Sequence, residues 1–129
     1  MARAPETPFE AFVRELFAGL GPVSIRRMFG GGGVYARGVM FALLADETIY
    51  LKTAPALDPL FDAEDCPPFI YQPPNGPAVA MSYRRMPEAA LDDPDMAADW
   101  GRRSLEAQLA AAAARPPRKR KGPGADAGA

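Results

Sequence analysis

The stretch RRMFGGGGVYARGVMF, residues 26–41, contains the residue types that come closest to a known chemical motif. Glycine-rich loops hold phosphate groups with backbone N–H groups, and Gly31, Gly33 and Ala36 formally fit the dinucleotide pattern G-x-G-x-x-G/A. That pattern works where a helix begins directly after it, because the helix N-terminus holds the pyrophosphate. Here another extended segment follows, and the lysine and Ser or Thr of a P-loop are lacking. The glycines therefore indicate architecture more than a nucleotide site.

A glycine run inside or at the end of a strand has a cost that a structural role must offset. Each glycine loses about 0.5–1 kcal/mol relative to alanine, or roughly 2–4 kcal/mol for the four. We therefore expect some of them to serve a β-bulge, a positive backbone angle φ, or the close approach of another segment. The remaining alternatives are that the glycines are merely tolerated or that they contact a ligand.

Residues suited to catalysis or metal binding are scarce in the rest of the chain. The sequence has no histidine, which removes the usual general base and the commonest metal ligand. Cys66 is the single cysteine, so neither a cysteine metal cluster nor an intrachain disulfide can form. Asp92, Asp93, Asp95 and Asp99 gather where a helix is expected to begin, and a helix N-terminus favours acids without any metal. We expect no catalytic residue, no metal site and no cofactor.

Positive charge is concentrated in arginine pairs within the body of the chain. Neighbouring side chains of a strand point to opposite faces, so only one arginine of a strand pair can lie on a given surface. Such arginines serve either as solvated charge with salt bridges at the rim or as contacts to a partner or a phosphate. The pairs are Arg26 with Arg27, Arg84 with Arg85, and Arg102 with Arg103.

The C-terminal segment, residues 115–129, differs in charge from the body. It holds five basic residues and one acid, a net charge of +4, whereas residues 1–114 carry −5. Its low-complexity composition predicts disorder. The segment is either a solubilising end or a weak, salt-sensitive contact for nucleic acid or an acidic protein, and no aromatic residue is present for base stacking. Its basic residues are Arg115, Arg118, Lys119, Arg120 and Lys121.

Hydrophobic periodicity predicts an α+β fold in the order helix, three strands, helix, two strands, helix. Thr7, Pro8 and Glu10 form a capping box that begins a helix. Residues 23–53 change to a strand-like period with breaks at 37–38 and 46–47, which indicates a three-stranded antiparallel meander. A short helix or turn is expected over 54–64, strands over 69–72 and 78–83, and a last helix from 94 to 114. Grouped strands favour a two-layer antiparallel sandwich over residues 1–114.

The segment 39–45 (VMFALLA) is apolar at every position, unlike a strand with one face in water. Strict alternation places Val39, Phe41, Leu43 and Ala45 on one face, and residues 40, 42 and 44 on the other. Helices can cover one face. A partner chain or the rest of the core must cover the other face. The first of these alternatives predicts that the protein forms a homodimer.

Several of these segments together resemble the N-terminal domain of the TfoX/Sxy family of competence regulators. They are residues 26–53, 68–72 (PFIYQ), 81–94 (MSYRRMPEAALDDP) and the helix around Trp100. The resemblance implies an α+β two-layer sandwich and a role like that of transcriptional coactivators that act with the cyclic-AMP receptor protein. Those coactivators have a second, C-terminal domain. In this sequence only the basic segment 115–129 follows residue 114, so we expect a stand-alone N-terminal domain. The motif residues that carry the resemblance are Met28, Phe29, Gly30, Gly31, Gly33, Tyr35, Phe41 and Tyr50.

These observations favour a non-enzymatic regulatory or protein-interaction module. We expect a protein partner, such as a component of the transcription machinery, with Arg26, Arg27, Arg84 and Arg85 as candidate contacts. The first alternative is a small protein that binds nucleic acid through residues 115–129, and the second is an enzyme or a small-molecule binder with its site at the glycine-rich strand. No apolar run reaches the roughly 20 residues of a membrane span, and the first ten residues do not resemble a secretory signal, so a cytoplasmic protein is expected.

Overall fold

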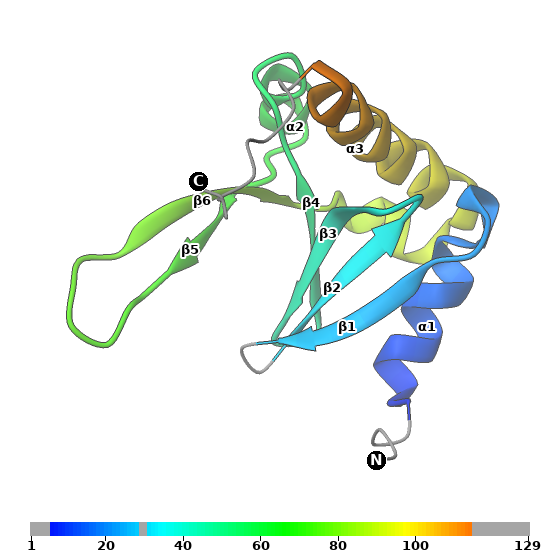
Figure 1. The fold of residues 1–129 in the computed structure, drawn as a ribbon, viewed down its shortest axis with the longest axis horizontal. Coiled ribbons are helices and arrows are strands. Elements are labelled where there is room, and N and C mark those ends of the chain that lie inside the picture. The colour runs from blue at the N-terminus through cyan, green and yellow to red at the C-terminus, as the bar shows by residue number, and fades with distance from the viewer. Residues whose placement is uncertain (1–5, 29–30, 115–129) are drawn as a thin grey trace, which may run out of the picture.

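The computed structural model of the chain describes residues 6–28 and 31–114. Over these residues the fold is a six-stranded antiparallel sheet packed against helices (Figure 1), which confirms the predicted α+β class. The sheet order is β1-β2-β3-β4-β6-β5. The strands are β1 (Ser24–Met28), β2 (Gly31–Ala36), β3 (Val39–Ala45), β4 (Thr48–Lys52), β5 (Pro68–Tyr71) and β6 (Val79–Arg85); the helices are α1 (Pro8–Leu16), α2 (Asp58–Ala63) and α3 (Pro94–Ala114), with short 3-10 helices η1 (Ala18–Leu20) and η2 (Glu88–Asp92).

Helix α1 begins at the predicted capping box. The Glu10 N–H donates to Thr7 Oγ1 at 3.1 Å, and the Thr7 N–H donates to Glu10 Oε1 at 3.0 Å. Pro8 occupies the first turn, where its missing N–H has no partner to lose. Val13 and Leu16, one turn apart on this helix, are buried in the core. The local sequence therefore sets both where α1 starts and which side it buries.

The meander has four strands where three were predicted, because the first predicted strand is two. β1 ends at Met28, β2 begins at Gly31, and the two strands pair antiparallel from Ser24↔Tyr35 to Met28↔Gly31. Hydrophobic periodicity does not show this reversal, since the glycines have no side chains to mark a change of direction. Phe29 and Gly30 lie outside the described residues.

The two predicted breaks in the meander are hairpin turns. Arg37 and Gly38 have φ of 52° and 84°, and Asp46 and Glu47 have φ of 51° and 55°. Two consecutive residues with positive φ are what a type I′ turn requires, and this turn matches the twist of paired strands. Glu47 therefore holds a left-handed conformation that glycine would adopt at lower cost.

Strand β3 contains an extra residue that changes the expected alternation. Val34 and Tyr35 are neighbours on β2, but their partners on β3 are Ala42 and Met40, which leaves Phe41 between the two pairs. Phe41 is fully buried, and its ring packs edge-on against another core phenylalanine with the centroids 5.3 Å apart. Because of this extra residue, strict alternation cannot hold on both sides of Phe41, and the face assignment predicted for residues 39–45 is wrong.

The hydrophobic core lies between one face of the sheet and helices α1 and α3 (Figure 1). Val34 and Leu51 are fully buried on this face and pack in one cluster with Trp100 of α3. Helix α3 begins as predicted, because the Met96 N–H donates to the side chain of Asp93 at 3.1 Å. Among the described residues, no helix is long and apolar enough to cross a bilayer.

The hairpin formed by β5 and β6 projects from the rest of the sheet (Figure 1). β6 pairs with β4 only over residues 83–85, at the base of the hairpin. In the described part of the chain, the remainder of β6 pairs with β5 alone. β1 and β5 are therefore the two edge strands of the sheet.

Candidate functional site

The arginines of each strand pair point to opposite faces of the sheet, as the strand period predicts. Arg27 of β1 and Arg84 of β6 bind carboxylates of helices on the core side. Arg26 and Arg85 lie on the other side, which is the sheet surface away from α1 and α3. We call this surface the open face. Of these four arginines, Arg26 and Arg85 are the two that lie on the open face.

Arg27 is held to the first turn of α1 by a bidentate ion pair with Glu10. Arg27 Nε donates to Glu10 Oε2 at 3.0 Å, and Arg27 Nη2 donates to Glu10 Oε1 at 2.8 Å. Glu10 is only 7% exposed and also accepts the capping hydrogen bond of Thr7. The hydrogen bond to Glu10 raises the pKa of Arg27. One buried carboxylate therefore joins the start of the helix to the edge of the sheet.

Arg84 fastens the base of the hairpin to α2. Its Nε donates to the Cys66 carbonyl oxygen at 2.8 Å, and its Nη1 donates to Asp58 Oδ1 at 3.1 Å. The guanidinium also forms an ion pair with Asp62 and lies 5.8 Å from the centroid of the Phe61 ring. Burial raises the pKa of the Cys66 thiol, which keeps it protonated at neutral pH. These contacts give Arg84 a structural role.

The glycines of β2 serve close approach, one of the roles expected of them. A Cβ on Gly31 would lie 1.9 Å from the Leu44 carbonyl oxygen of β3, where no atom fits. A Cβ on Gly33 would lie 2.9 Å from Met40 Sδ and 3.0 Å from Met28 Cε. The first glycine admits a neighbouring backbone, and the second admits two methionine side chains.

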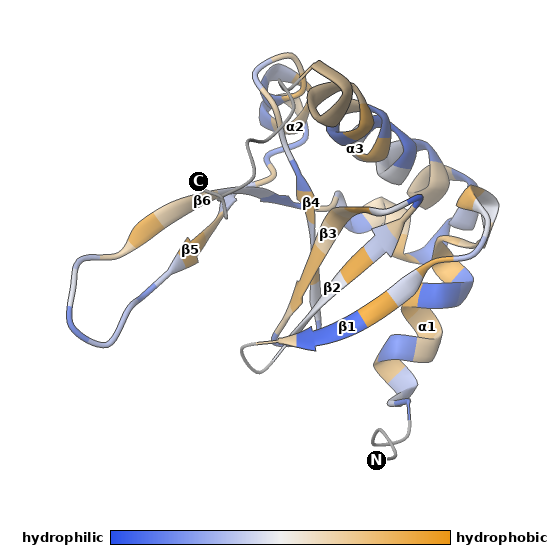
Figure 2. Cartoon of the chain, viewed as in Figure 1, coloured by the Kyte–Doolittle hydropathy of each residue, from blue (hydrophilic) through white to orange (hydrophobic). Residues whose placement is uncertain are grey.

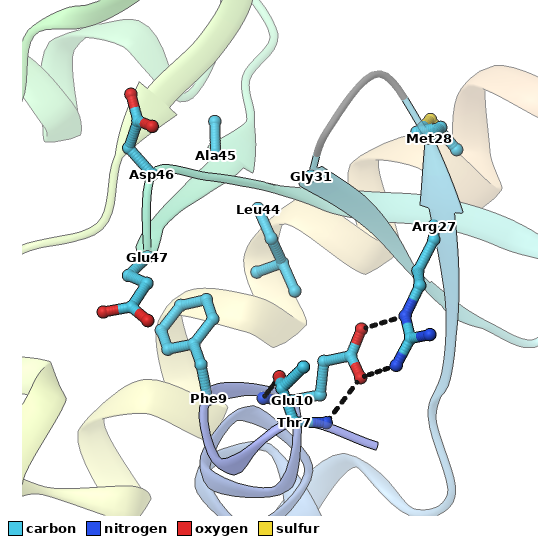
Figure 3. Close-up of a pocket in the computed structure, with 10 residues that line it drawn as sticks. All are labelled: Thr7, Phe9, Glu10, Arg27, Met28, Gly31, Leu44, Ala45, Asp46 and Glu47. Atoms are coloured by element: carbon cyan, nitrogen blue, oxygen red, sulfur yellow. Dashed lines mark hydrogen bonds and ion pairs between the residues drawn. The ribbon is translucent and has the colours of Figure 1, made fainter. Parts of the chain in front are cut away.

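A pocket of about 560 Å³ lies beside the glycines, between the start of α1 and the turn from β3 to β4 (Figure 3). Figure 3 shows the Arg27 guanidinium and the Glu10 carboxylate pointing toward each other, with the carboxylates of Asp46 and Glu47 pointing away from them. The positive charge of Arg27 on the pocket wall is therefore neutralised by the carboxylate of Glu10. Such a wall does not favour a phosphate, which agrees with the lack of a helix after the glycines.

Metal ligands do not gather in the described part of the chain. Over residues 6–28 and 31–114, no three His, Cys, Asp or Glu side chains are close enough together to hold a metal ion. The acids at the start of α3 act locally: Asp93 caps the helix and Asp99 pairs with Arg102 at 3.0 Å.

The open face gathers basic and aromatic side chains from five strands. The Arg26 guanidinium lies 4.8 Å from the centroid of the Tyr35 ring, and Lys52 Nζ lies 4.8 Å from that of Tyr83. Burial, with a smaller contribution from the Tyr35 phenol, raises the pKa of Tyr83. The rings of Tyr50 and Phe69 also meet, with their centroids 4.9 Å apart. We call the set the basic–aromatic cluster; it consists of Arg26, Tyr35, Tyr50, Lys52, Phe69, Tyr83 and Arg85.

The sequence predictions name four members of this cluster and omit Lys52, Phe69 and Tyr83. The signal for two of these is the strand period, because YLK at 50–52 and YRR at 83–85 place every second residue on one face. The sheet order gives no such local signal, since β6 lies between β4 and β5. Only this order brings Tyr83 beside Lys52.

The other predicted site residues lie in the core, on the open face or outside the described residues. Phe41 is a core residue, and Met28 ends β1 on the open face beside Gly33. The residues outside the described ranges are Phe29, Gly30, Arg115, Arg118, Lys119, Arg120 and Lys121.

The sequence matches a known protein family. The family model described as the TfoX N-terminal domain matches residues 15–108, which is more than half of the chain. No curated protein matches the sequence. The matched segment runs from the end of α1 into α3 and contains the whole sheet, including the glycines and the basic–aromatic cluster. The resemblance seen in the sequence is confirmed, and the chain belongs to the TfoX N-terminal domain family.

Proposed function

We propose that the chain is a non-enzymatic regulatory module that acts by binding a protein partner, with the β5–β6 hairpin as the docking element. The observation that carries this proposal is the exposure of large apolar side chains on the hairpin: Ile70 is 52% exposed, Tyr71 45%, Val79 45% and Met81 39%. Figure 2 shows hydrophobic segments in both strands of the projecting hairpin. Apolar side chains gathered on one exposed element are typical of protein–protein contact sites.

The edge of the sheet offers a way for such a partner to bind. β5 pairs with β6 on one side and is the last strand of the sheet, so its other side presents backbone N–H and C=O groups. An extended segment of a partner would add to this edge by main-chain hydrogen bonds, with its side chains against Ile70 and Tyr71. A two-stranded hairpin is marginally stable alone in water, so this addition would also order the hairpin.

The regulatory part of the proposal rests on the family. Membership of the TfoX N-terminal domain family and the resemblance to competence coactivators make the transcription machinery the first partner to test. A non-enzymatic role is supported by the lack of histidine in the sequence and by the use of Arg27 and Arg84 in internal ion pairs.

Substitutions in the hairpin test the proposal. The double variant Ile70→Ser/Val79→Ser should lose a protein that copurifies with the wild type in fixed stoichiometry. Because both side chains are exposed, the free energy of unfolding should change by no more than about 1 kcal/mol in total. The matched control is Leu60→Ser on α2, where the side chain is 43% exposed, and it should keep the partner. Retention of the partner by the hairpin variant would contradict the proposal.

Light scattering on the same variants separates a foreign partner from a second copy. If the wild type is a dimer and Ile70→Ser/Val79→Ser is a monomer, the hairpin mediates the predicted homodimer and the docked protein is another copy of this chain. If the wild type is monomeric, the copurifying protein is a distinct partner.

A further inference from the structure

The open face is a sheet surface that no helix covers in the described part of the chain. Strand residues that point the other way are buried: Ile25, Ile49 and Leu51 are at most 2% exposed. Every member of the basic–aromatic cluster, in contrast, keeps contact with solvent, and Arg26 and Arg85 are exposed. An extended surface of partly exposed rings is typical of a site that a ligand covers.

The charge of the open face decides which class of ligand fits. Arg26, Lys52 and Arg85 are basic, and none of the described strand residues on this face is acidic. The positive charge is local, because residues 1–114 together carry a net charge of −5. A second copy docked face to face would oppose like charges, and the basic residues of 115–121 would do the same. A polyanion is therefore favoured.

The aromatic rings distinguish a nucleic acid from an acidic protein. Tyr35 on β2 and Tyr50 on β4 are separated by one strand, roughly 10 Å across the sheet, and Tyr83 lies on the strand next to Tyr50. Arg26 lies over the Tyr35 ring and Lys52 over the Tyr83 ring, each 4.8 Å from the ring centroid. A base that stacks on the same ring face would displace the cation, which is then placed to contact the adjacent phosphate. Sheets that stack unpaired bases on aromatic side chains while cations follow the backbone are an established mode of single-strand binding.

We propose that the open face binds single-stranded nucleic acid, either DNA or RNA, through the basic–aromatic cluster. The tyrosines stack on bases, and Arg26, Lys52 and Arg85 contact phosphates. This activity goes beyond the proposed protein binding, because it uses neither the exposed apolar side chains of the hairpin nor a protein partner. The segment 115–129 contains no aromatic residue, so the rings needed for base stacking come from the sheet.

Fluorescence anisotropy with the full chain tests this proposal. The probes are labelled 20-nucleotide strands of mixed sequence, one of DNA and one of RNA, with a DNA duplex as competitor, all starting at 50 mM salt. Tyr35→Leu/Tyr83→Leu keeps apolar volume but removes two rings, and it should weaken binding at least fivefold for each ring that stacks. The duplex should compete poorly. The ratio of the DNA and RNA affinities identifies the preferred strand.

The charge contribution has a matched control on the opposite side of the sheet. Arg26→Gln/Arg85→Gln removes two cations from the open face, and should lower the slope of log affinity against log salt by about 1.4. Arg102→Gln/Arg103→Gln removes the same number and kind of charge from α3, and should leave affinity and slope within twofold of wild type. Because Arg26 and Arg85 are exposed, this variant tests the proposal even if the tyrosine variant does not fold.

Four results would overturn the proposal. Binding that disappears when the five basic residues of 115–121 become glutamine, yet survives both open-face variants, would place the site in that segment. Equal affinity for the duplex, with no effect of the tyrosine variant, would exclude stacking. Failure to bind either strand at 50 mM salt, with binding of polyglutamate through Arg26 and Arg85, would assign the face to an acidic protein. A dimer dissolved by Tyr35→Leu/Tyr83→Leu would assign it to a second copy.

Discussion

Substitution of Gly31 by alanine is the sharpest test of the role assigned to the glycine run. The added Cβ would lie 1.9 Å from the carbonyl oxygen of Leu44 and 3.0 Å from its carbonyl carbon. Both atoms belong to the backbone of β3, so no change of rotamer relieves the clash and the two strands must separate locally. Overpacking costs about 1–3 kcal/mol, and a clash with backbone lies at the upper end of that range. We expect Gly31→Ala to lower the free energy of unfolding by about 3 kcal/mol.

Gly33→Ala is the matched control, two residues along the same strand. Its Cβ would meet Met40 Sδ at 2.9 Å and Met28 Cε at 3.0 Å, which are ends of flexible side chains at the surface. Alanine also restricts the unfolded chain, which stabilises by about 0.4–1 kcal/mol, so the net change should stay within about 1 kcal/mol. Urea unfolding followed by the fluorescence of Trp100, the single tryptophan, measures both variants. Equal losses, or a Gly31→Ala protein as stable as the wild type, would refute the close approach of β2 and β3.

Two further predictions concern the buried carboxylate and the buried thiol. Glu10→Ala should lower the free energy of unfolding by about 2 kcal/mol, because it removes the carboxylate shared by the helix cap and Arg27, whereas Arg102→Ala, in an exposed pair, should cost at most about 0.5 kcal/mol in the same urea assay. If Glu10→Ala lowered the free energy of unfolding no more than Arg102→Ala does, the shared carboxylate would add no more stability than an exposed ion pair. Burial raises the pKa of Cys66 above its usual 9.0, so the unfolded chain loses this proton first as the pH rises. The contribution of the thiol to the free energy of unfolding is therefore complete below about pH 9, and it is lost as the pH rises toward the folded pKa. The urea midpoint of Cys66→Ala should therefore fall less than that of the wild type between about pH 8 and 10, and parallel curves would contradict this assignment.

Features that depend on neighbouring residues could be predicted from the sequence. The capping box needs Thr7 and Glu10, three positions apart, and the hairpin turn needs Asp46 and Glu47, which are adjacent. The opposite faces of paired arginines follow from the strand period alone. In each case the physical cause lies within one turn of helix or one pair of strand residues, so the sequence contains it directly.

Features that depend on register and strand order could not be predicted in this way. The reversal between β1 and β2 falls where glycines remove the side-chain pattern, and the burial of Phe41 follows from one extra residue in β3. The place of β6 between β4 and β5 is set by long-range pairing, and it decides that Tyr83 lies beside Lys52. The sequence therefore contains the residue types of the candidate cluster but not their association.

The glycine run and the basic–aromatic cluster belong to one surface. Gly31 and Gly33 face the same side of β2 as Tyr35, and neither has a side chain to stand beside that ring. Met28 and Met40 fill the space over Gly33, so a larger residue there would push both methionines outward and obstruct the approach of a base to Tyr35. In the proposed binding mode, the run that formally matches a phosphate loop contacts no phosphate. Its glycines leave room for the two methionine side chains beside Tyr35, and the phosphate contacts come from Arg26, Lys52 and Arg85.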